Sequence, residues 1–185
     1  MILTSFPPIA FPDARVLILG SMPGQRSLAL GQYYGHPQND FWYVMGEVCG
    51  AGLDLPYADR TAKLAAAGIA LWDVLQHCER EGSLDSDIVR ATKVPNDLAA
   101  LLPTCPLIRA IFFNGQEAES SFLKLVKPNL APALLSGILL KRLPSTSPAN
   151  RMARAEKLKA WRALEAFLPA TERRLGIMRV LKEFS

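Results

Sequence analysis

Four short apolar runs recur along the chain, and their spacing constrains its fold more than any other feature. The runs are RVLILG (15–20), GIALWDV (68–74), IRAIFFNG (108–115) and GILLKRL (137–143). Each has the length and the β-branched or aromatic content of a buried strand, and the segments between them are long enough to form helices. The pattern therefore predicts an α/β fold with three layers, α/β/α, around a roughly four-stranded parallel sheet.

The predicted helices lie at residues 38–49, 57–67, 95–102, 115–126 and 151–167. The last of them carries one apolar stripe, formed by Leu158, Trp161, Leu164 and Leu168. A chain of 185 residues, of which 50% are hydrophobic and 21% charged, is long enough to bury one sizeable core. We therefore expect a single domain over residues 1–185.

Basic residues are concentrated in the last quarter of the chain. Residues 141–185 contain 11 of the 21 Lys and Arg residues and 4 of the 17 Asp and Glu residues. Such a segment faces either a phosphate backbone or solvent. The N-terminus lacks a signal-peptide pattern, and no apolar segment approaches the roughly 20 residues that span a bilayer. We expect a cytoplasmic protein, associated with the nucleoid in a prokaryote, that does not bind a membrane.

Polar or glycine-rich segments follow each predicted strand, namely GSMPG, WDV, NG and PSTSPANR. The carboxyl ends of parallel strands lie at one edge of a sheet, so these four loops are expected to share one cleft. GSMPGQRS lacks the GxxxxGK[ST] spacing of a nucleotide phosphate loop, because Gln25 stands where the lysine is needed. A classical nucleotide-binding site is therefore not predicted.

Metal and covalent chemistry also lack their patterns. The two histidines, His36 and His77, belong to no zinc motif, and the three cysteines form no CxxC pair that would indicate zinc, an iron–sulfur cluster or a disulfide framework. There is no GxSxG nucleophile motif. We expect no metal and no cofactor, and a site built from amides, hydroxyls, aromatic rings and main chain.

Three motifs in order resemble those of the uracil-DNA glycosylase superfamily. LILGSMPGQRSLALGQYYGHPQNDFW resembles its first motif, IFFNG resembles a segment of its thymine/uracil mismatch branch, and LPSTSPANR is similar to its second motif. The resemblance covers roughly residues 14–165. It implies a uracil-DNA glycosylase-like fold and a hydrolase that flips a deaminated base out of double-stranded DNA, which is the partner we expect for a monomeric protein.

One departure distinguishes the branches. Met22 stands where superfamily members carry an Asn or Asp that positions water, and a methionine thioether cannot orient water in this way. The motif GSMPG…QYYGHPQNDFW resembles instead that of the deoxyinosine (hypoxanthine) DNA glycosylase branch, which implies Asn39 as the catalytic residue. This resemblance implies a monofunctional glycosylase that removes hypoxanthine and leaves an abasic site, as a step of base excision repair.

The candidate site residues fall into three groups. The catalytic candidate is Asn39, which can accept a hydrogen bond from the attacking water or donate one to the departing base. The base-pocket candidates are Ser21, Met22, Pro23, Gly24, Tyr33, Tyr34, Phe41, Trp72 and Asn114. The DNA-binding candidates are Ser145, Thr146, Ser147, Asn150 and Arg151. The resemblance implies contacts with flanking phosphates for Ser145, Ser147 and Arg151.

Structural interpretations of the same residues stay open at this stage. Asn39 is also a preferred helix N-cap, Asn114 also suits a turn, and Phe41 and Trp42 also suit core packing at a helix start, which we favour for Trp42. The alternative functions are excision of uracil or of mismatched uracil and thymine, a non-catalytic module that binds damaged DNA, and a nucleoside hydrolase or phosphate-binding protein.

Overall fold

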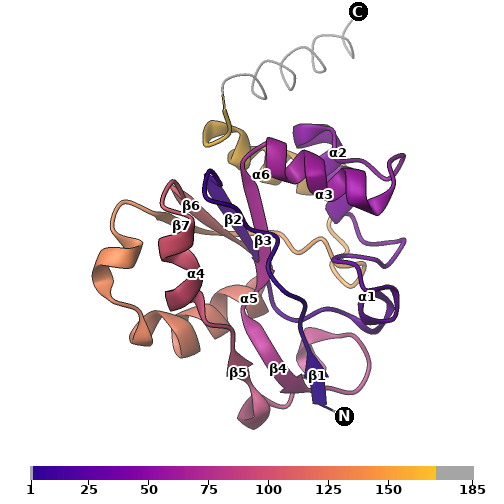
Figure 1. Cartoon of the computed structure of the whole chain (residues 1–185). Helices are drawn as coiled ribbons and strands as arrows, with labels where there is room; N and C mark the ends of the chain where they lie inside the picture. The colour runs from indigo at the N-terminus through magenta and orange to yellow at the C-terminus, as the bar shows by residue number, and fades with distance from the viewer. Residues whose placement is uncertain (1, 170–185) are drawn as a thin grey trace, which may run out of the picture.

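The computed structural model describes residues 2–169, and its central feature is a parallel sheet of four strands (Figure 1). The strands are β2 (Val16–Gly20), β3 (Ile69–Asp73), β6 (Ala110–Asn114) and β7 (Leu139–Leu143), in the order β3-β2-β6-β7. Every residue of β2, β3 and β6 is buried, as expected for parallel strands covered on both faces. The predicted fold class and the four predicted strands are confirmed.

Helices cover both faces of this sheet. In Figure 1, α2 (Phe41–Cys49), α3 (Tyr57–Ala66) and α6 (Arg154–Trp161) lie on one face, whereas α4 (Leu98–Thr104) and α5 (Gln116–Ser121) lie on the other. The arrangement has the three predicted layers. The apolar stripe predicted on the last helix faces the core, where Trp161, Leu164 and Leu168 are fully buried and Leu158 is partly buried.

Several helix boundaries differ from those predicted. A π-helical turn follows α5 over Phe122–Val126, and a 3₁₀ turn follows α6 over Arg162–Ala166. The structure places the start of α6 at Arg154, after the predicted start at 151, because residues 147–152 form turns held by side-chain hydrogen bonds. Pro148 therefore lies in the loop before α6 and not in the first turn of the helix.

Other elements were not predicted. A short helix, α1 (Gln25–Leu30), follows β2, and a three-stranded antiparallel sheet has the order β1 (Ile2–Thr4), β4 (Leu75–Glu79), β5 (Val94–Pro95). These strands are short and partly polar, so they lack the apolar run that marked the central strands. Short 3₁₀ turns lie at Asp85–Asp87, Arg90–Thr92, Lys127–Asn129 and Pro132–Leu135.

Residues 2–169 contain no helix long and apolar enough to cross a bilayer. No group of three or more His, Cys, Asp or Glu side chains in this described part of the chain is placed to hold a metal ion. The predicted single domain also includes residues 170–185, which lie outside the described residues.

Candidate active site

A cavity of about 550 Å³ opens at the carboxyl edge of the central sheet. The last residues of β2, β3 and β6 line it, together with the segment before α2 and the loop before α6. The four loops predicted to converge therefore share one cleft. Residues 83–86, in the loop after β4, also line the cavity and were not predicted to do so.

Most of the predicted site residues line this cavity. They are Ser21, Met22, Pro23, Gly24, Tyr33, Tyr34, Asn39, Asn114, Ser145, Thr146, Ser147 and Asn150. Phe41, Trp72 and Arg151 do not line it. Arg151 is solvent-exposed beside the cavity loop, so its position is compatible with the DNA contact that the resemblance implies.

Two predicted pocket residues lie behind the cavity wall. Phe41 is fully buried and stacks on Tyr34, with ring centroids 3.9 Å apart and an interplanar angle of 18°. Its place is therefore to support the wall and not to form it. The Trp72 indole N–H donates to the backbone oxygen of Phe6 at 3.0 Å, which ties β3 to the N-terminal segment and turns the ring away from the cavity.

The paired tyrosines take different places. Tyr33 is buried, and its hydroxyl donates to the backbone oxygen of Pro7 at 3.1 Å. Tyr34 has a φ of 53°, the single positive value outside glycine among the described residues, and such strain is common at functional sites. Trp42 is fully buried, and its indole N–H donates to the backbone oxygen of Tyr33 at 2.9 Å, which confirms its core position.

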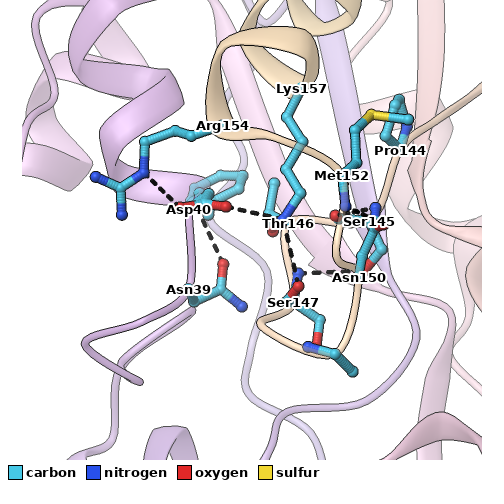
Figure 2. A network of polar contacts seen from close by, with 12 residues as sticks. Asn39, Asp40, Pro144, Ser145, Thr146, Ser147, Asn150, Met152, Arg154 and Lys157 are labelled. Carbon is cyan, nitrogen blue, oxygen red and sulfur yellow. Dashed lines mark hydrogen bonds and ion pairs between the residues drawn. The ribbon is translucent and has the colours of Figure 1, made fainter.

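The Asn39 side chain is half-buried at the cavity edge, just before α2. Its Oδ1 accepts a hydrogen bond from the Phe41 backbone N–H at 3.0 Å (Figure 2). Because a backbone N–H can only donate, this contact fixes which atom of the amide is oxygen. The Asn39 Nδ2 group is thereby turned away from the helix start. Asp40 is the N-cap residue of α2, so Asn39 precedes the cap and binds the N–H of the first helical residue through Oδ1, while Nδ2 stays available for the catalytic interpretation.

Asp40 connects this segment to the C-terminal helix (Figure 2). Its carboxylate accepts hydrogen bonds from Arg154 Nε at 2.7 Å and from Lys157 Nζ at 2.8 Å, and its backbone N–H donates to the Thr146 oxygen at 2.9 Å. Burial alone would raise the pKa of Asp40, but the two cations outweigh it and lower that pKa. Lys157 is itself 2% exposed, so the pair is buried.

The loop before α6 is held by its own polar groups. Ser145 Oγ accepts from the Ser147 N–H at 3.2 Å, and Asn150 Nδ2 donates to the Ser145 oxygen at 2.8 Å. Asn114 holds Thr146 from both sides, because Asn114 Nδ2 donates to Thr146 Oγ1 at 2.8 Å and Asn114 Oδ1 accepts from the Thr146 N–H at 2.9 Å. Thr146 is fully buried, which is incompatible with the DNA contact predicted for it.

An acidic residue that was not assigned to the site lies at the cavity floor. Asp73, the last residue of β3, is 3% exposed, and its Oδ2 accepts from Ser5 Oγ at 2.7 Å. Burial raises the pKa of Asp73 to about 7, and nearby Asp85 contributes to the rise. Gly20 lies opposite Asp73 in the sheet, and a side chain there would clash with Asp73 Oδ1.

A second unassigned acid comes from the loop after β4. Asp85 Oδ1 accepts from Ser21 Oγ at 2.6 Å and lines the cavity. Desolvation of this carboxyl group raises the pKa of Asp85, although the hydrogen bond from Ser21 opposes the shift. The position of Asp73 at the end of a predicted strand was a signal that could have identified it, whereas Asp85 follows no predicted strand.

These features describe an α/β protein with a cavity of about 550 Å³ at the carboxyl edge of its sheet, lined by amides, hydroxyls and two acids. Residues 7–167 match the sequence profile of the uracil DNA glycosylase superfamily. The chain belongs to this superfamily.

Named relatives and a solved structure agree with this assignment. The chain is 37% identical over 165 residues to a hypoxanthine DNA glycosylase of Methanosarcina acetivorans, covering 89% of this chain and 98% of the relative. It is 35% identical over 163 residues to a hypoxanthine DNA glycosylase of Methanosarcina barkeri, covering 88% and 96%. A solution NMR structure of a candidate uracil DNA glycosylase from M. acetivorans superposes with a TM-score of 0.71 at 36% identity, covering 89% of this chain and 99% of that one.

Proposed function

We propose that this chain is a monofunctional DNA glycosylase that removes hypoxanthine from double-stranded DNA as a monomer. It flips the deoxyinosine nucleotide into the cavity, hydrolyses the N-glycosidic bond and leaves an abasic site. Membership of the superfamily and the two relatives named as hypoxanthine DNA glycosylases support the reaction and the base. The cavity volume of about 550 Å³ lies within the range of small-molecule sites.

The orientation of Asn39 is the observation that carries the proposal. Cleavage leaves negative charge on the departing purine, and a fixed donor at that point stabilises the transition state. The Phe41 N–H holds the amide oxygen of Asn39, which leaves Nδ2 as the group that can donate to the base. We therefore assign Asn39 to the departing base and not to the attacking water.

Asp73 suits the recognition of a lactam base. Hypoxanthine presents one N–H donor beside one carbonyl acceptor, and a protonated carboxyl group presents the matching acceptor and donor. Asp73 lines the cavity, and burial raises its pKa to about 7, so the neutral form is accessible near neutral pH. Its depth at the end of β3 is compatible with contact to the base edge and not to the sugar.

The absence of an amine nucleophile supports monofunctional hydrolysis. A glycosylase that also cleaves the strand forms a Schiff base through an amine, usually a lysine. None of the described residues that line the cavity is a lysine. Lys157 lies nearby in the same region of the fold, but Asp40 binds its ammonium group in a buried ion pair.

The test of the substrate uses four duplexes that differ at one position: hypoxanthine, uracil, xanthine or an undamaged base. After incubation with the protein, alkali cleaves abasic sites and electrophoresis measures them. We expect cleavage of the hypoxanthine duplex and none of the undamaged one. Cleavage of another duplex with hypoxanthine left intact would contradict the proposed base, and binding without base release would favour a non-catalytic module.

Asn39→Ala tests the mechanism in the same assay. Removing one transition-state hydrogen bond costs roughly 2.7–4 kcal/mol, so we expect excision to slow about a hundredfold or more, with DNA affinity largely kept. Gln38→Ala is the matched control, because Gln38 is exposed next to Asn39 and does not line the cavity. Wild-type rates for Asn39→Ala would show that another residue carries the reaction.

A further inference from the structure

The loop of residues 80–87, which follows β4, is bound closely to the GSMPG segment. Arg80 is buried, and its Nη2 donates to the Pro23 backbone oxygen. Ser83 Oγ accepts from the Gln25 N–H at 3.1 Å, and Asp85 accepts from Ser21 Oγ at 2.6 Å. Three contacts therefore fix the 80–87 loop against a segment that lines the cavity, and they hold one carboxyl group of the loop at the cavity wall.

Asp85 has an oxygen left for a ligand. Its Oδ1 accepts from Ser21, and its Oδ2 accepts no hydrogen bond from the described residues. Among residues 2–169, the carboxyl groups that line the cavity are those of Asp85 and Asp73. Asp73 is 3% exposed at the end of a central strand, whereas Asp85 is an exposed loop residue whose carboxyl group is desolvated where it faces the cavity. The two acids therefore lie at different depths.

Because the two acids lie at different depths, they would face different parts of a bound nucleotide. A flipped base enters the deep part of a pocket, and its sugar stays near the mouth because it remains attached to the DNA backbone. Water that attacks C1′ must also be near the mouth. Neither the Asn39 amide, whose Oδ1 already accepts from the Phe41 N–H, nor the Met22 thioether can take a proton from this water, whereas a carboxylate can.

We propose that Asp85 is a catalytic residue that accepts the proton of the attacking water. This assignment rests on the proposed function. The water oxygen forms a bond to C1′ as the bond from C1′ to purine N9 breaks, and the electron pair of that bond leaves with the base. One water proton passes to Asp85, and the other stays on the new C1′ hydroxyl. The purine anion, bound by Asn39, is protonated from solvent, and Asp85 returns its proton to solvent.

The surroundings of Asp85 suit a general base. Desolvation and the nearby carboxyl group of Glu117 raise its pKa, and the cations Arg80 and Lys93 moderate the rise. A carboxylate of higher pKa holds a proton more strongly, and general-base efficiency increases as the pKa approaches the working pH. Asp73 shares the cavity and titrates as well, so a pH profile alone would not separate the two acids.

Single-turnover excision from a hypoxanthine duplex by the full chain tests the assignment, with Asp85→Asn, Asp85→Ala and the control Asp87→Asn. Asparagine keeps the shape and an acceptor for Ser21 but cannot take a proton. Asp87 lies two residues away in the same 3₁₀ turn and does not line the cavity.

We expect Asp85→Asn to lower the excision rate at saturating enzyme about a hundredfold. The enzyme concentration that gives half the maximal rate should stay unchanged, and Asp87→Asn should excise at the wild-type rate. Added formate should restore part of the Asp85→Ala rate and none of the Asn39→Ala rate.

The outcomes separate this assignment from the proposed function. Excision by Asp85→Asn within threefold of wild type would overturn the role of Asp85 and leave the glycosylase proposal intact. A slow Asp85→Ala enzyme that formate does not restore would overturn it too, because Asp85 would then serve to hold Ser21. A wild-type protein that releases a different base would contradict the substrate proposal, and the same variants would then be compared on that base.

Discussion

Two walls of the cavity differ in how their polar groups are bound. One, the amide wall, consists of Asn39, Asn114 and residues 145–150, and its polar atoms largely bind one another. The other, the acidic wall, consists of Asp73 and residues 83–85, where each of two acids has a raised pKa and one oxygen bound by a serine hydroxyl. The amide wall is suited to hold a fixed geometry, whereas the acidic wall is suited to exchange protons.

The amide wall depends on an ion pair beneath it, and breaking that pair should have the largest effect. Asp40→Ala leaves Lys157 buried without its carboxylate, and removing one partner of a buried pair costs about 3–5 kcal/mol. We expect a loss of that size in the free energy of unfolding, measured by urea denaturation. Glu156→Ala, an exposed change on the same helix, should stay within about 0.5 kcal/mol.

A second substitution tests whether the loss of stability comes from the unpaired charge that Asp40→Ala leaves on Lys157. Replacing both partners, as in Asp40→Ala with Lys157→Met, removes the unpaired buried charge, so the double variant should be more stable than Asp40→Ala alone. A loss below about 1 kcal/mol for Asp40→Ala would show that solvent and the Ser147 backbone oxygen, to which Lys157 Nζ also donates, are enough to solvate the Lys157 ammonium. The amide wall would then be less dependent on its support than the distances indicate.

Gly20→Ala tests how closely the acidic wall is packed. A Cβ at Gly20 would clash with Asp73 Oδ1 and lie 3.0 Å from the Tyr34 hydroxyl, so the buried acid must move. Overpacking of this kind costs about 1–3 kcal/mol, and we expect a lower melting temperature together with slower excision. Gly24→Ala is the control for stability, because its nearest neighbour outside the adjacent residues is Ser83 Oγ at an ordinary 3.5 Å. Equal stability of the two variants would show that Asp73 moves at no cost.

The amide wall was largely predictable from the sequence, because its residues follow predicted strands or lie in motifs. Asn39 and Asn114 are examples, and the shared edge of parallel strands brings their loops together. The sequence could not predict which side chains are already hydrogen-bonded or packed within the protein and so cannot contact a ligand. From the sequence alone, Thr146 and Phe41 are plausible ligand contacts. In the structure, Thr146 is hydrogen-bonded to Asn114, and Phe41 stacks on Tyr34.

The acidic wall escaped prediction for a different reason. Asp85 reaches the cavity through β4, a short strand with two buried residues that directly follows β3 and belongs to the second sheet. No apolar run marks that strand, and the loop after it has no sequence pattern that indicates a contact with Ser21. Such a contact joins residues 64 positions apart, so it follows from the tertiary fold and not from local sequence.

Asp73→Asn provides the sharpest test of the acidic wall. The pKa of Asp73 is about 7 in the folded protein, against an ordinary value of 3.8, so the folded state binds more protons than the unfolded state between those pH values. The wild type therefore loses stability as the pH rises from about 4 to 7, and an uncharged asparagine removes that loss.

We expect Asp73→Asn to be more stable than wild type by at least about 1 kcal/mol at pH 8, with the advantage shrinking as the pH falls toward 4. Ser5 can donate to the new amide oxygen as it does to the carboxylate, and Asp13→Asn, at an exposed turn residue, is the control. An advantage that does not change with pH would show that Asp73 keeps an ordinary pKa, and the contrast between a fixed wall and a titrating wall would then rest on Asp85 alone.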